Sequence, residues 1–298
     1  MTPAEPARRG AAGVALVVGS AAAFGALAIF ARQAYADGVD TATLLALRFT
    51  IAAIVMGAAC AAARVTWPKG RDLAVLVAMG AIGYAGQAAS FFTALTLAPA
   101  GLIALLLYLH PAIVAGLAAW RLHERLPPAG LAAIAVALVG TALTVVPSLA
   151  ASDAAIHPAG VGFGLLAALL YAVYIVVGSG VAARVEPLAM STVIIASAAV
   201  VYDAVAAIRG PAWPAGAHGW LAVAAIALVS TVAAITMFFA GLGRIGPTRA
   251  SALSTVEPVV TIVLAAWVLG ERTGPWQVGG GALILAAVIV LARTGART

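Results

Sequence analysis

Hydrophobic residues run along this chain in long blocks that short polar segments separate. Each block is about twenty residues long, which is the length that an α-helix needs to cross the hydrocarbon core of a bilayer. The apolar residues follow one another without the alternation typical of strands in a transmembrane barrel. The pattern predicts ten membrane-spanning helices, at 13–33, 41–63, 72–94, 100–121, 128–147, 159–182, 188–208, 217–240, 247–269 and 275–293.

The composition agrees with a chain that is solvated by lipid. Of the 298 residues, 64% are hydrophobic and only 9% are charged, and the mean hydropathy is +1.11. Because a soluble domain has about a quarter of its residues charged, this chain cannot cover a water-facing surface. We therefore expect an all-α integral membrane protein. The single cysteine, Cys60, excludes an internal disulfide.

The positive charges predict an orientation in the membrane. The net charge of +6 does not indicate nucleic-acid binding, because the basic residues are scattered over short loops. With the N-terminus in the cytoplasm, twelve basic residues lie inside (Arg8, Arg9, Arg64, Lys69, Arg71, Arg121, Arg125, Arg184, Arg244, Arg249, Arg293 and Arg297) and three outside (Arg32, Arg209 and Arg272). This asymmetry predicts a multi-pass protein of the bacterial inner (plasma) membrane with both termini in the cytoplasm.

The start of the first span and the tryptophan residues bear on where the spans begin and end. The first span follows Arg8 and Arg9 like a signal peptide, but it lacks a small-residue cleavage site, so we expect it to remain in the mature chain. The six tryptophans all lie at or near predicted helix ends, where an amphipathic ring suits the headgroup region.

A repeated phrase links the two halves of the chain. The segment "HPAIVAGLAAWRLHER" at 110–125 returns as "EPVVTIVLAAWVLGER" at 257–272, an offset of 147 residues. Over residues 91–128 this offset gives thirteen identities, where a composition so rich in alanine gives about four by chance. The same offset lays residues 13–24 over 160–171, so the repeat begins at the first span.

The length of the repeat determines its orientation. Each copy holds five spans, and an odd number of crossings turns the second copy upside down, as in many secondary transporters. The predicted fold is thus ten transmembrane helices in two inverted-topology five-helix repeats. We place the first repeat at 1–147, an extracytoplasmic linker at 148–158 and the second repeat at 159–298.

Motifs in the second, fourth and ninth spans, and their order along the chain, resemble those of a known family. Arg48-Phe49 stands early in the second span, and the fourth and ninth spans each hold a proline that is followed by Ala-Trp and then by a glutamate. This pattern resembles the drug/metabolite transporter superfamily, EamA type, and is most similar to its amino-acid exporters, including the aromatic amino-acid exporter. The resemblance implies a central cavity lined by helices 1, 3 and 4 and their counterparts 6, 8 and 9.

Glu257 and His110 are the main candidate site residues. Glu257 lies about ten residues, or roughly 15 Å, into the ninth span, where an ionised carboxylate is costly unless it meets water, a partner or a proton. His110 is its repeat mate in the fourth span. The pair predicts a site for a substrate amine or a proton, and the structural alternative is that both groups only tie helices together.

Other polar groups inside spans complete the predicted site. Polar-tipped aromatic side chains suit a mostly apolar pocket with a few hydrogen-bond donors, although core packing would also explain them. The candidates for substrate binding or coupling are Tyr84, Gln87, Tyr108, Tyr171, Tyr174 and Ser254. Pro111 and Pro258 each free a carbonyl one turn earlier and so predict a kink or an opening.

Arg48 is assigned a structural or gating role rather than contact with substrate. It lies about eight residues into the second span, and we expect it to act through a carboxyl group or a helix C-terminus. Asp203 is expected to pair with Arg209 or to reach the outer surface. Glu124 and Glu271 are expected to form local caps or ion pairs.

The function predicted from these features is secondary transport. The expected solute is a neutral or aromatic amino acid moving outward by alternating access, with proton coupling and downhill movement both left open. The alternatives are a drug, cation or nucleotide-sugar carrier of the same superfamily, or an intramembrane enzyme. The sequence lacks the paired aspartates or Ser-His arrangement that such an enzyme needs, and it has no metal-ligand spacing, so neither a cofactor nor a metal nor an obligate protein partner is expected.

Overall fold

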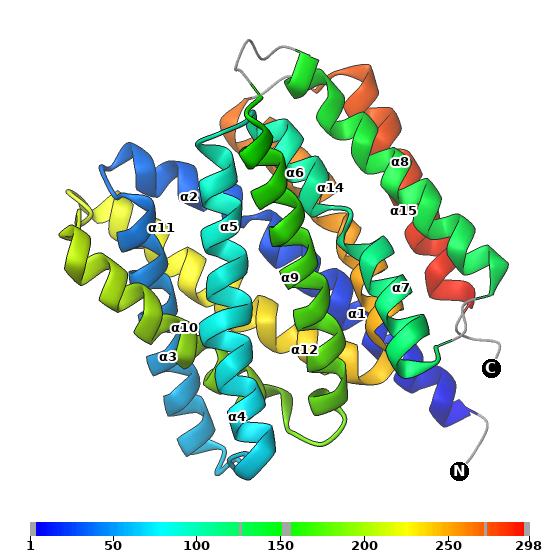
Figure 1. Cartoon of the computed structure of the whole chain (residues 1–298), viewed down its shortest axis with the longest axis horizontal. Coiled ribbons are helices and arrows are strands. Elements are labelled where there is room, and N and C mark those ends of the chain that lie inside the picture. Colours follow the sequence, from blue (N-terminus) through cyan, green and yellow to red (C-terminus); the bar gives the residue numbers. More distant parts are fainter. Residues whose placement is uncertain (1–3, 125–126, 151–155, 271–272, 295–298) are drawn as a thin grey trace.

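The computed structural model describes residues 4–124, 127–150, 156–270 and 273–294, and these form helices joined by short connections (Figure 1). Within them, ten helical stretches are long and apolar enough to cross a membrane, which confirms the predicted spans. They cover Gly10–Ala36, Thr41–Ala62, Gly70–Leu95, Leu102–Arg121, Pro128–Val145, Pro158–Ala182, Pro187–Arg209, Ala217–Ile245, Pro247–Leu269 and Pro275–Arg293.

Five of the spans are regular helices, and their bounds follow the proline, glycine and polar signals of the sequence. They are α3 (Thr41–Ala62), α8 (Pro128–Ala150), α9 (Pro158–Ala182), α10 (Pro187–Arg209) and α15 (Pro275–Thr294). Proline begins four of these helices because the first helical position needs no backbone N–H. The fifth, α3, is capped by Asp40, whose carboxylate accepts from the Thr43 N–H at 2.9 Å.

The other five spans are interrupted. The first breaks at Ala26, between α1 (Ala4–Gly25) and α2 (Leu27–Ala36). The third and eighth each contain a π-helical turn. They consist of α4 (Gly70–Ala78), η1 (Met79–Tyr84) and α5 (Ala85–Leu95), and of α11 (Ala217–Ala227), η2 (Leu228–Ala233) and α12 (Ala234–Ile245). The sequence predicted neither these turns nor the break at Ala26.

The fourth and ninth spans break at equivalent places. The fourth consists of α6 (Ala100–Leu107) and α7 (His110–Leu122). The ninth consists of α13 (Pro247–Leu253), the 3₁₀ turn η3 (Ser254–Val256) and α14 (Glu257–Leu269). Because α7 and α14 begin and end at residues that are 147 apart, the backbone follows the repeat that the sequence shows.

Pairs of helices from opposite halves build the bundle. Helix α15 packs along α8, α10 along α3 and α12 along α1, and in Figure 1 the α8–α15 pair forms one edge of the molecule. The start of α1 and the end of α15 lie at the same end of the bundle, as an even number of spans requires. The two halves are therefore interleaved rather than separate bodies.

Small residues allow the closest of these contacts. A Cβ atom added to Gly280 on α15 would lie 2.9 Å from the Thr144 backbone nitrogen on α8, and one added to Gly140 would lie 2.7 Å from the Gly280 oxygen. In a membrane, where apolar burial does not drive helices together, such close backbone approach lets dispersion contacts hold them. Gly140 and Gly280 are therefore the residues that let α8 and α15 approach most closely.

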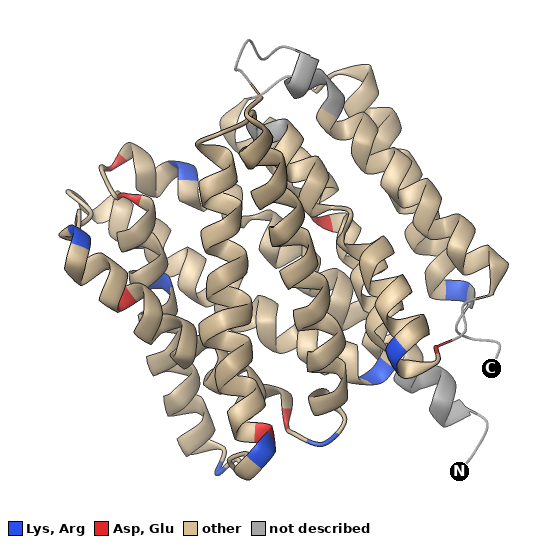
Figure 2. Ribbon diagram, viewed as in Figure 1, with Lys and Arg blue, Asp and Glu red and all other residues tan. Residues whose placement is uncertain are grey.

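Charged and aromatic residues mark the ends of the bundle. Most Lys, Arg, Asp and Glu residues lie near the two ends (Figure 2). All six tryptophans are exposed, and Trp213 is stacked on Trp220. At one of these ends, burial raises the pKa of Asp40, but hydrogen bonds from Thr43 and Ala212 outweigh it and hold that pKa below its usual value.

The α8–α15 contact gives a signed stability prediction. Gly280→Ala should destabilise the protein by about 1–3 kcal/mol, because the added methyl group collides with α8. The control is Gly279→Ala, where an added Cβ meets nothing within 4 Å and the better helix propensity of alanine should leave stability equal or higher. Thermal unfolding of the detergent-solubilised protein measures both, and equal unfolding temperatures for the two variants would contradict the packing.

Candidate functional site

The backbone breaks in the fourth and ninth spans place two polar side chains at helix starts in the middle of the bundle. His110 is the first residue of α7 and Glu257 the first of α14, and each is followed by a proline, Pro111 or Pro258. A proline fits the first turn of a helix, where N–H groups have no partner within the helix. A carboxylate in the first turn, such as that of Glu257, is also favoured by the helix dipole.

His110 is buried, and its two ring nitrogens differ. Nδ1 lies 3.1 Å from the carbonyl oxygen of Leu107, the last residue of α6, so the ring bridges the break. Because a carbonyl only accepts, Nδ1 must donate, which leaves Nε2 as an acceptor in the neutral ring. Nε2 is buried and has no hydrogen-bond partner among the described residues.

A row of aromatic rings runs from His110 across the centre of the bundle. The ring centroids of His110 and Tyr171 are 4.6 Å apart. Those of Tyr171 and Tyr174 are 6.3 Å apart, and those of Tyr174 and Tyr84 are 5.8 Å apart. Tyr108, in the break before His110, has its ring 6.4 Å from the imidazole. We call these five residues the aromatic row. The Tyr174 hydroxyl is buried and has no partner in the described part of the chain.

Glu257 lies beside this row. Its side chain keeps partial exposure, and its carboxyl group is within electrostatic range of the Tyr108 and Tyr171 hydroxyls. Helix α1 packs tightly here, since a Cβ added to Gly25 would lie 2.8 Å from the Glu257 carbonyl oxygen. The Thr261 hydroxyl donates to the Gly25 and Glu257 carbonyls at 2.9 and 3.1 Å. Glu257, His110, Tyr108 and Tyr171 thus form one cluster.

Arg48 marks the other end of the row. Its buried guanidinium donates from Nε to the Thr231 hydroxyl at 3.1 Å and from Nη2 to the Tyr84 hydroxyl at 3.2 Å. Tyr84 belongs to η1 and Thr231 to η2, so Arg48 joins the two π-helical turns. We expected a carboxyl group or a helix C-terminus as its partner, but among the described residues hydroxyl groups bind it.

The other polar residues that the sequence singled out lie outside the cluster around Glu257 and His110. Gln87 is half-buried on α5, one turn after Tyr84. The Ser254 hydroxyl donates to the Ala250 carbonyl of its own helix, at 3.0 Å. Asp203 accepts a hydrogen bond from Thr50 instead of pairing with Arg209. Glu124 accepts one from Thr248, which joins the end of α7 to the start of α13.

The sequence did not reveal several residues at the centre of the bundle, and some residues that it singled out lie outside the part of the chain that the structure describes. Thr231 was available as the repeat mate of Tyr84, and both bind Arg48. Phe49 and Tyr202, whose rings extend the row beyond Tyr84, gave no polar signal that would separate them from the core. Glu271, Arg125, Arg272 and Arg297, and the side chains of Arg8 and Arg9, lie outside the described residues.

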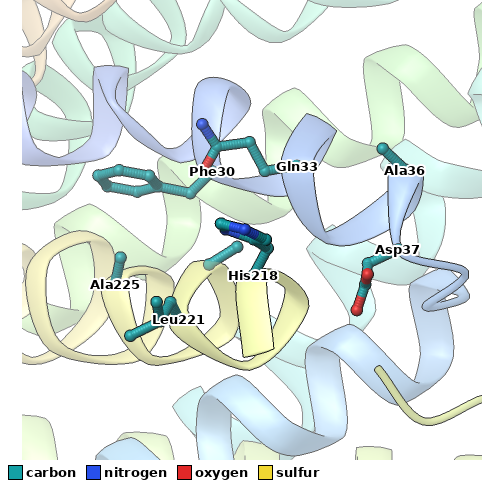
Figure 3. Close-up of a pocket in the computed structure, with 8 residues that line it drawn as sticks. Phe30, Gln33, Ala36, Asp37, His218, Leu221 and Ala225 are labelled. Carbon is teal, nitrogen blue, oxygen red and sulfur yellow. The ribbon is translucent and has the colours of Figure 1, made fainter. Parts of the chain in front are cut away.

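Two surface pockets lie at opposite ends of the bundle. One, of about 570 Å³, lies between α2 and α11, where Figure 3 shows Phe30 and Gln33 across from His218, with Asp37 to one side. The other, of about 720 Å³, lies between α4 and the ends of α7 and α9. The repeat relates them, because Phe30 corresponds to Val177, Asp37 to Arg184 and His218 to Arg71.

Ten spans in two inverted halves, with helices broken at equivalent central positions, are the architecture of a secondary transporter. The model of the EamA-like transporter family matches residues 11–146 and 158–293, so each half matches separately. The chain belongs to this family and is a membrane transporter.

Individual relatives agree with this class. A probable terminal-alkyne amino-acid exporter from Streptantibioticus cattleyicolor is 29% identical over 266 residues, which cover 86% of each chain. An uncharacterised transporter from Archaeoglobus fulgidus is 25% identical over 93% of this chain and 95% of its own. A crystal structure with 24% identity superposes with a TM-score of 0.80 over 93% of this chain and 95% of that one, and so shares the fold.

The contacts of Arg48 give a prediction about the centre. Tyr84→Phe should lower stability by about 1–3 kcal/mol, since it removes an acceptor from a buried guanidinium. Tyr35→Phe is the matched control, because Tyr35 is 40% exposed near a helix end, and it should change stability little. Unfolding in a denaturing-detergent titration measures both, and a Tyr84→Phe protein as stable as the parent would show that the hydroxyl contributes nothing to Arg48.

Proposed function

We propose that the protein is an alternating-access exporter of neutral or aromatic amino acids in the bacterial inner membrane, with both termini in the cytoplasm. Membership in the EamA-like family supports transport of a small molecule. The name of the Streptantibioticus cattleyicolor relative supports an amino acid as the solute. The excess of basic residues on one set of loops supports the orientation.

The observation that carries the amino-acid assignment is the pair of acceptors at the helix breaks. The unpartnered Nε2 of His110 and the carboxylate of Glu257 both lie beside Tyr171. An unpartnered imidazole nitrogen and a carboxylate are both acceptors, so they suit a group that brings several protons of its own, such as a primary ammonium. The ring faces of Tyr108 and Tyr171 add cation–π attraction for the same charge.

The aromatic row suits the rest of such a solute. Tyr84, Tyr171 and Tyr174 offer apolar ring faces with hydroxyl groups at their tips, which is the lining expected for a small amphipathic molecule. The half-buried Gln87 adds an amide near Tyr84, and Ser254 is one turn before Glu257 on the same span. Arg48 keeps the structural or gating role, because it holds the two π-helical turns to α3.

The same acceptors also allow proton coupling. A proton on Glu257 or on Nε2 of His110 removes an acceptor that the ammonium needs, so proton binding and solute binding oppose each other. In alternating access, this competition produces exchange of an inward-moving proton for an outward-moving amino acid. Downhill movement without a proton remains the alternative that the transport test distinguishes.

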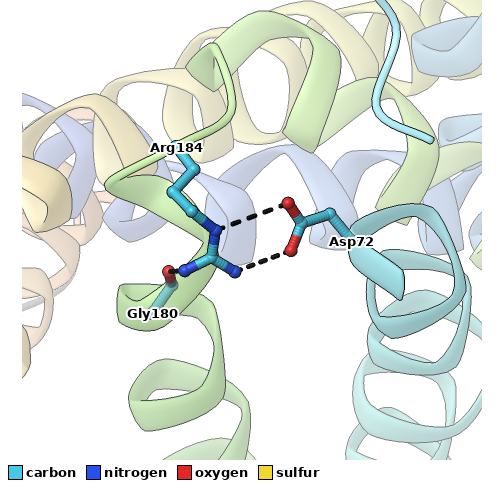
Figure 4. A network of polar contacts seen from close by, with 3 residues as sticks. All are labelled: Asp72, Gly180 and Arg184. Carbon is cyan, nitrogen blue, oxygen red and sulfur yellow. Dashed lines mark hydrogen bonds and ion pairs between the residues drawn. The ribbon is translucent and has the colours of Figure 1, made fainter. Parts of the chain in front are cut away.

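The two ends of the bundle support alternation, because equivalent contacts differ there. Helices α2 and α11 pack closely beside the pocket lined by Asp37 and His218. Their repeat counterparts, the end of α9 and α4, are bridged by the Arg184–Asp72 ion pair at 2.6 Å (Figure 4). Helices α4 and α11 both pack on equivalent helices, α10 and α3, but the close packing of α11 on α2 has no counterpart of similar extent between α4 and α9. Exchange of these two arrangements between the halves would close one end and open the other.

A drug or cation carrier is the second candidate, since an aromatic cation also fits an ionised Glu257 near tyrosine rings. A nucleotide-sugar carrier is less well supported, because phosphate binding needs cationic groups and the guanidinium of Arg48 is already engaged at Tyr84 and Thr231.

Transport by purified protein in liposomes tests the proposal. Counterflow of radiolabelled phenylalanine and leucine should occur, and Glu257→Gln and His110→Ala should each slow it about tenfold or more, the effect of losing one interaction with a charged group. Asp203→Asn is the control, as its carboxylate bonds Thr50 away from the row. Aromatic cationic dyes and nucleosides, run in parallel, identify the alternative carriers.

Transport measured at two pH values distinguishes proton exchange from downhill movement. With proton exchange, an inward proton gradient accelerates efflux from the parent protein, and Glu257→Gln is insensitive to that gradient. Counterflow that is the same at both pH values would reject coupling but retain transport. Full activity of both site variants would reject the assigned site.

A further inference from the structure

The pocket between α4, α7 and α9 carries a concentration of positive charge that transport does not explain. Four cationic side chains from three separate segments line its rim, and all four are exposed: Lys69, Arg71, Arg121 and Arg184. The pocket holds about 720 Å³. Asp72 is the acidic residue among those that line it.

Only one of these cations is neutralised within the described residues. Arg184 donates to both carboxylate oxygens of Asp72, at 2.6 and 3.4 Å, and its third nitrogen donates to the Gly180 carbonyl at the end of α9 (Figure 4). Asp72 raises the pKa of Arg184 above its usual value. Lys69, Arg71 and Arg121 make no hydrogen bond or ion pair in the described part of the chain, although Arg71 is within electrostatic range of Asp72. Four cations against one carboxylate leave the pocket with an excess of three positive charges.

The floor and the sides of the pocket are apolar. Val75, Val176 and Val181 line it below the cations. Val177 of α9 also lines the pocket, and outside it exposed apolar side chains continue along both neighbouring helices, with Leu73 and Val77 on α4 and Val173 on α9. A ligand that fits this surface therefore has an anionic group at the level of the helix ends and hydrocarbon that extends toward the membrane interior.

The repeat supplies an internal comparison. At the repeat-related positions, Gly216 stands for Lys69, His218 for Arg71, Val268 for Arg121 and Asp37 for Arg184. Of these four, Asp37 and His218 line the pocket at the other end. There the Asp37 carboxylate accepts from the Gly216 N–H at 2.7 Å and packs on Gly219. All four cations are thus absent from the counterpart, which shows that the fold itself does not require them.

The positive-inside rule alone does not account for this arrangement. That rule requires basic residues on loops at the cytoplasmic side, and Arg64, Arg244 and Arg293 satisfy it outside the pocket. It does not require residues from the α3–α4 connection, the end of α7 and the end of α9 to converge on one cavity. Basic pockets between membrane helices at this level are typical binding sites for acidic phospholipid headgroups.

We propose that this pocket binds the phosphate headgroup of an anionic phospholipid such as phosphatidylglycerol. Lys69, Arg71 and Arg121 contact the phosphate, and the acyl chains lie along the exposed valine and leucine side chains of α4 and α9. The Arg184–Asp72 pair holds the two walls of the pocket together. This site does not depend on the identity of the solute.

Lipid binding to the full-length protein tests the site directly. Native mass spectrometry of the protein in detergent, titrated with phosphatidylglycerol or phosphatidylcholine, counts the bound lipids. We expect selective retention of phosphatidylglycerol, and about tenfold or more weaker retention by the triple variant Lys69→Gln/Arg71→Gln/Arg121→Gln, since each cation near an anionic lipid contributes about 1 kcal/mol. Asp72 and Arg184 remain unchanged, so the contact between the helices is preserved.

A charge-matched control distinguishes a site from general surface attraction. The triple variant Arg64→Gln/Arg244→Gln/Arg293→Gln removes the same charge from exposed positions outside the pocket and should retain phosphatidylglycerol like the parent. Equal loss in both triple variants, or retention by the pocket variant, would overturn the proposal. Single variants of Lys69 and Arg121 should show graded losses, which provides the test if the triple variant is unstable.

Glycerol phosphate as a competitor distinguishes a lipid from a free phosphate. It carries the same anionic group without acyl chains, so it should not displace phosphatidylglycerol at matched concentration. The thermal stability of the parent should rise with phosphatidylglycerol and not with glycerol phosphate. If glycerol phosphate binds and stabilises as well as the lipid, the pocket is a site for soluble anions and the lipid assignment is wrong.

Discussion

The structure depends on the constraint that a lipid-embedded backbone must satisfy its own hydrogen bonds. No water is available in the hydrocarbon layer, so a helix can be interrupted there only where protein or a wet cavity surrounds it. This chain interrupts four spans at positions related by the repeat, at the breaks before His110 and Glu257 and at the two π-helical turns. Such turns are frequent at functional sites, and these four surround the aromatic row.

The repeat gives the two halves the same backbone, and the side chains make them different. His110 and Glu257 occupy equivalent helix starts but provide an imidazole and a carboxylate. Tyr84 and Thr231 are likewise equivalent, and one arginine from α3 binds both. At the ends, the same relation links an acidic pocket with a basic one. A symmetric scaffold therefore holds an asymmetric set of side chains at its centre, which is what the proposed selection of one solute needs.

Much of the fold was predictable from the sequence because its signals are local. Block length predicted the ten spans, and the offset that pairs Pro111 with Pro258 predicted the inverted halves. The convergence of Tyr171, His110 and Tyr84 depends on how distant helices pack, which residue type alone does not reveal. The π-helical turns could not be predicted, because the segments that form them, "MGAIGY" and "LVSTVA", have the same kinds of residue as the regular spans.

The sequence did not predict the hydrogen-bond partners of the charged residues within the spans. Burial of Arg48 called for a compensating group, and a carboxyl was the obvious expectation, but two hydroxyl groups from opposite halves supply the acceptors. Asp203 accepts a hydrogen bond from Thr50 rather than pairing with the nearby Arg209. In both cases the partner lies more than thirty residues away in sequence, so only the tertiary fold identifies it.

Chemical accessibility tests the proposal that the broken helices surround a water-accessible chamber. In a Cys60→Ser background, which removes the buried native thiol, a cysteine is introduced at Tyr171 in the aromatic row or at Val139, which is 55% exposed on α8. A charged, water-soluble thiol reagent should label Tyr171→Cys in membranes and leave Val139→Cys unlabelled in the lipid. Labelling of Val139→Cys with no reaction at Tyr171→Cys would contradict the account.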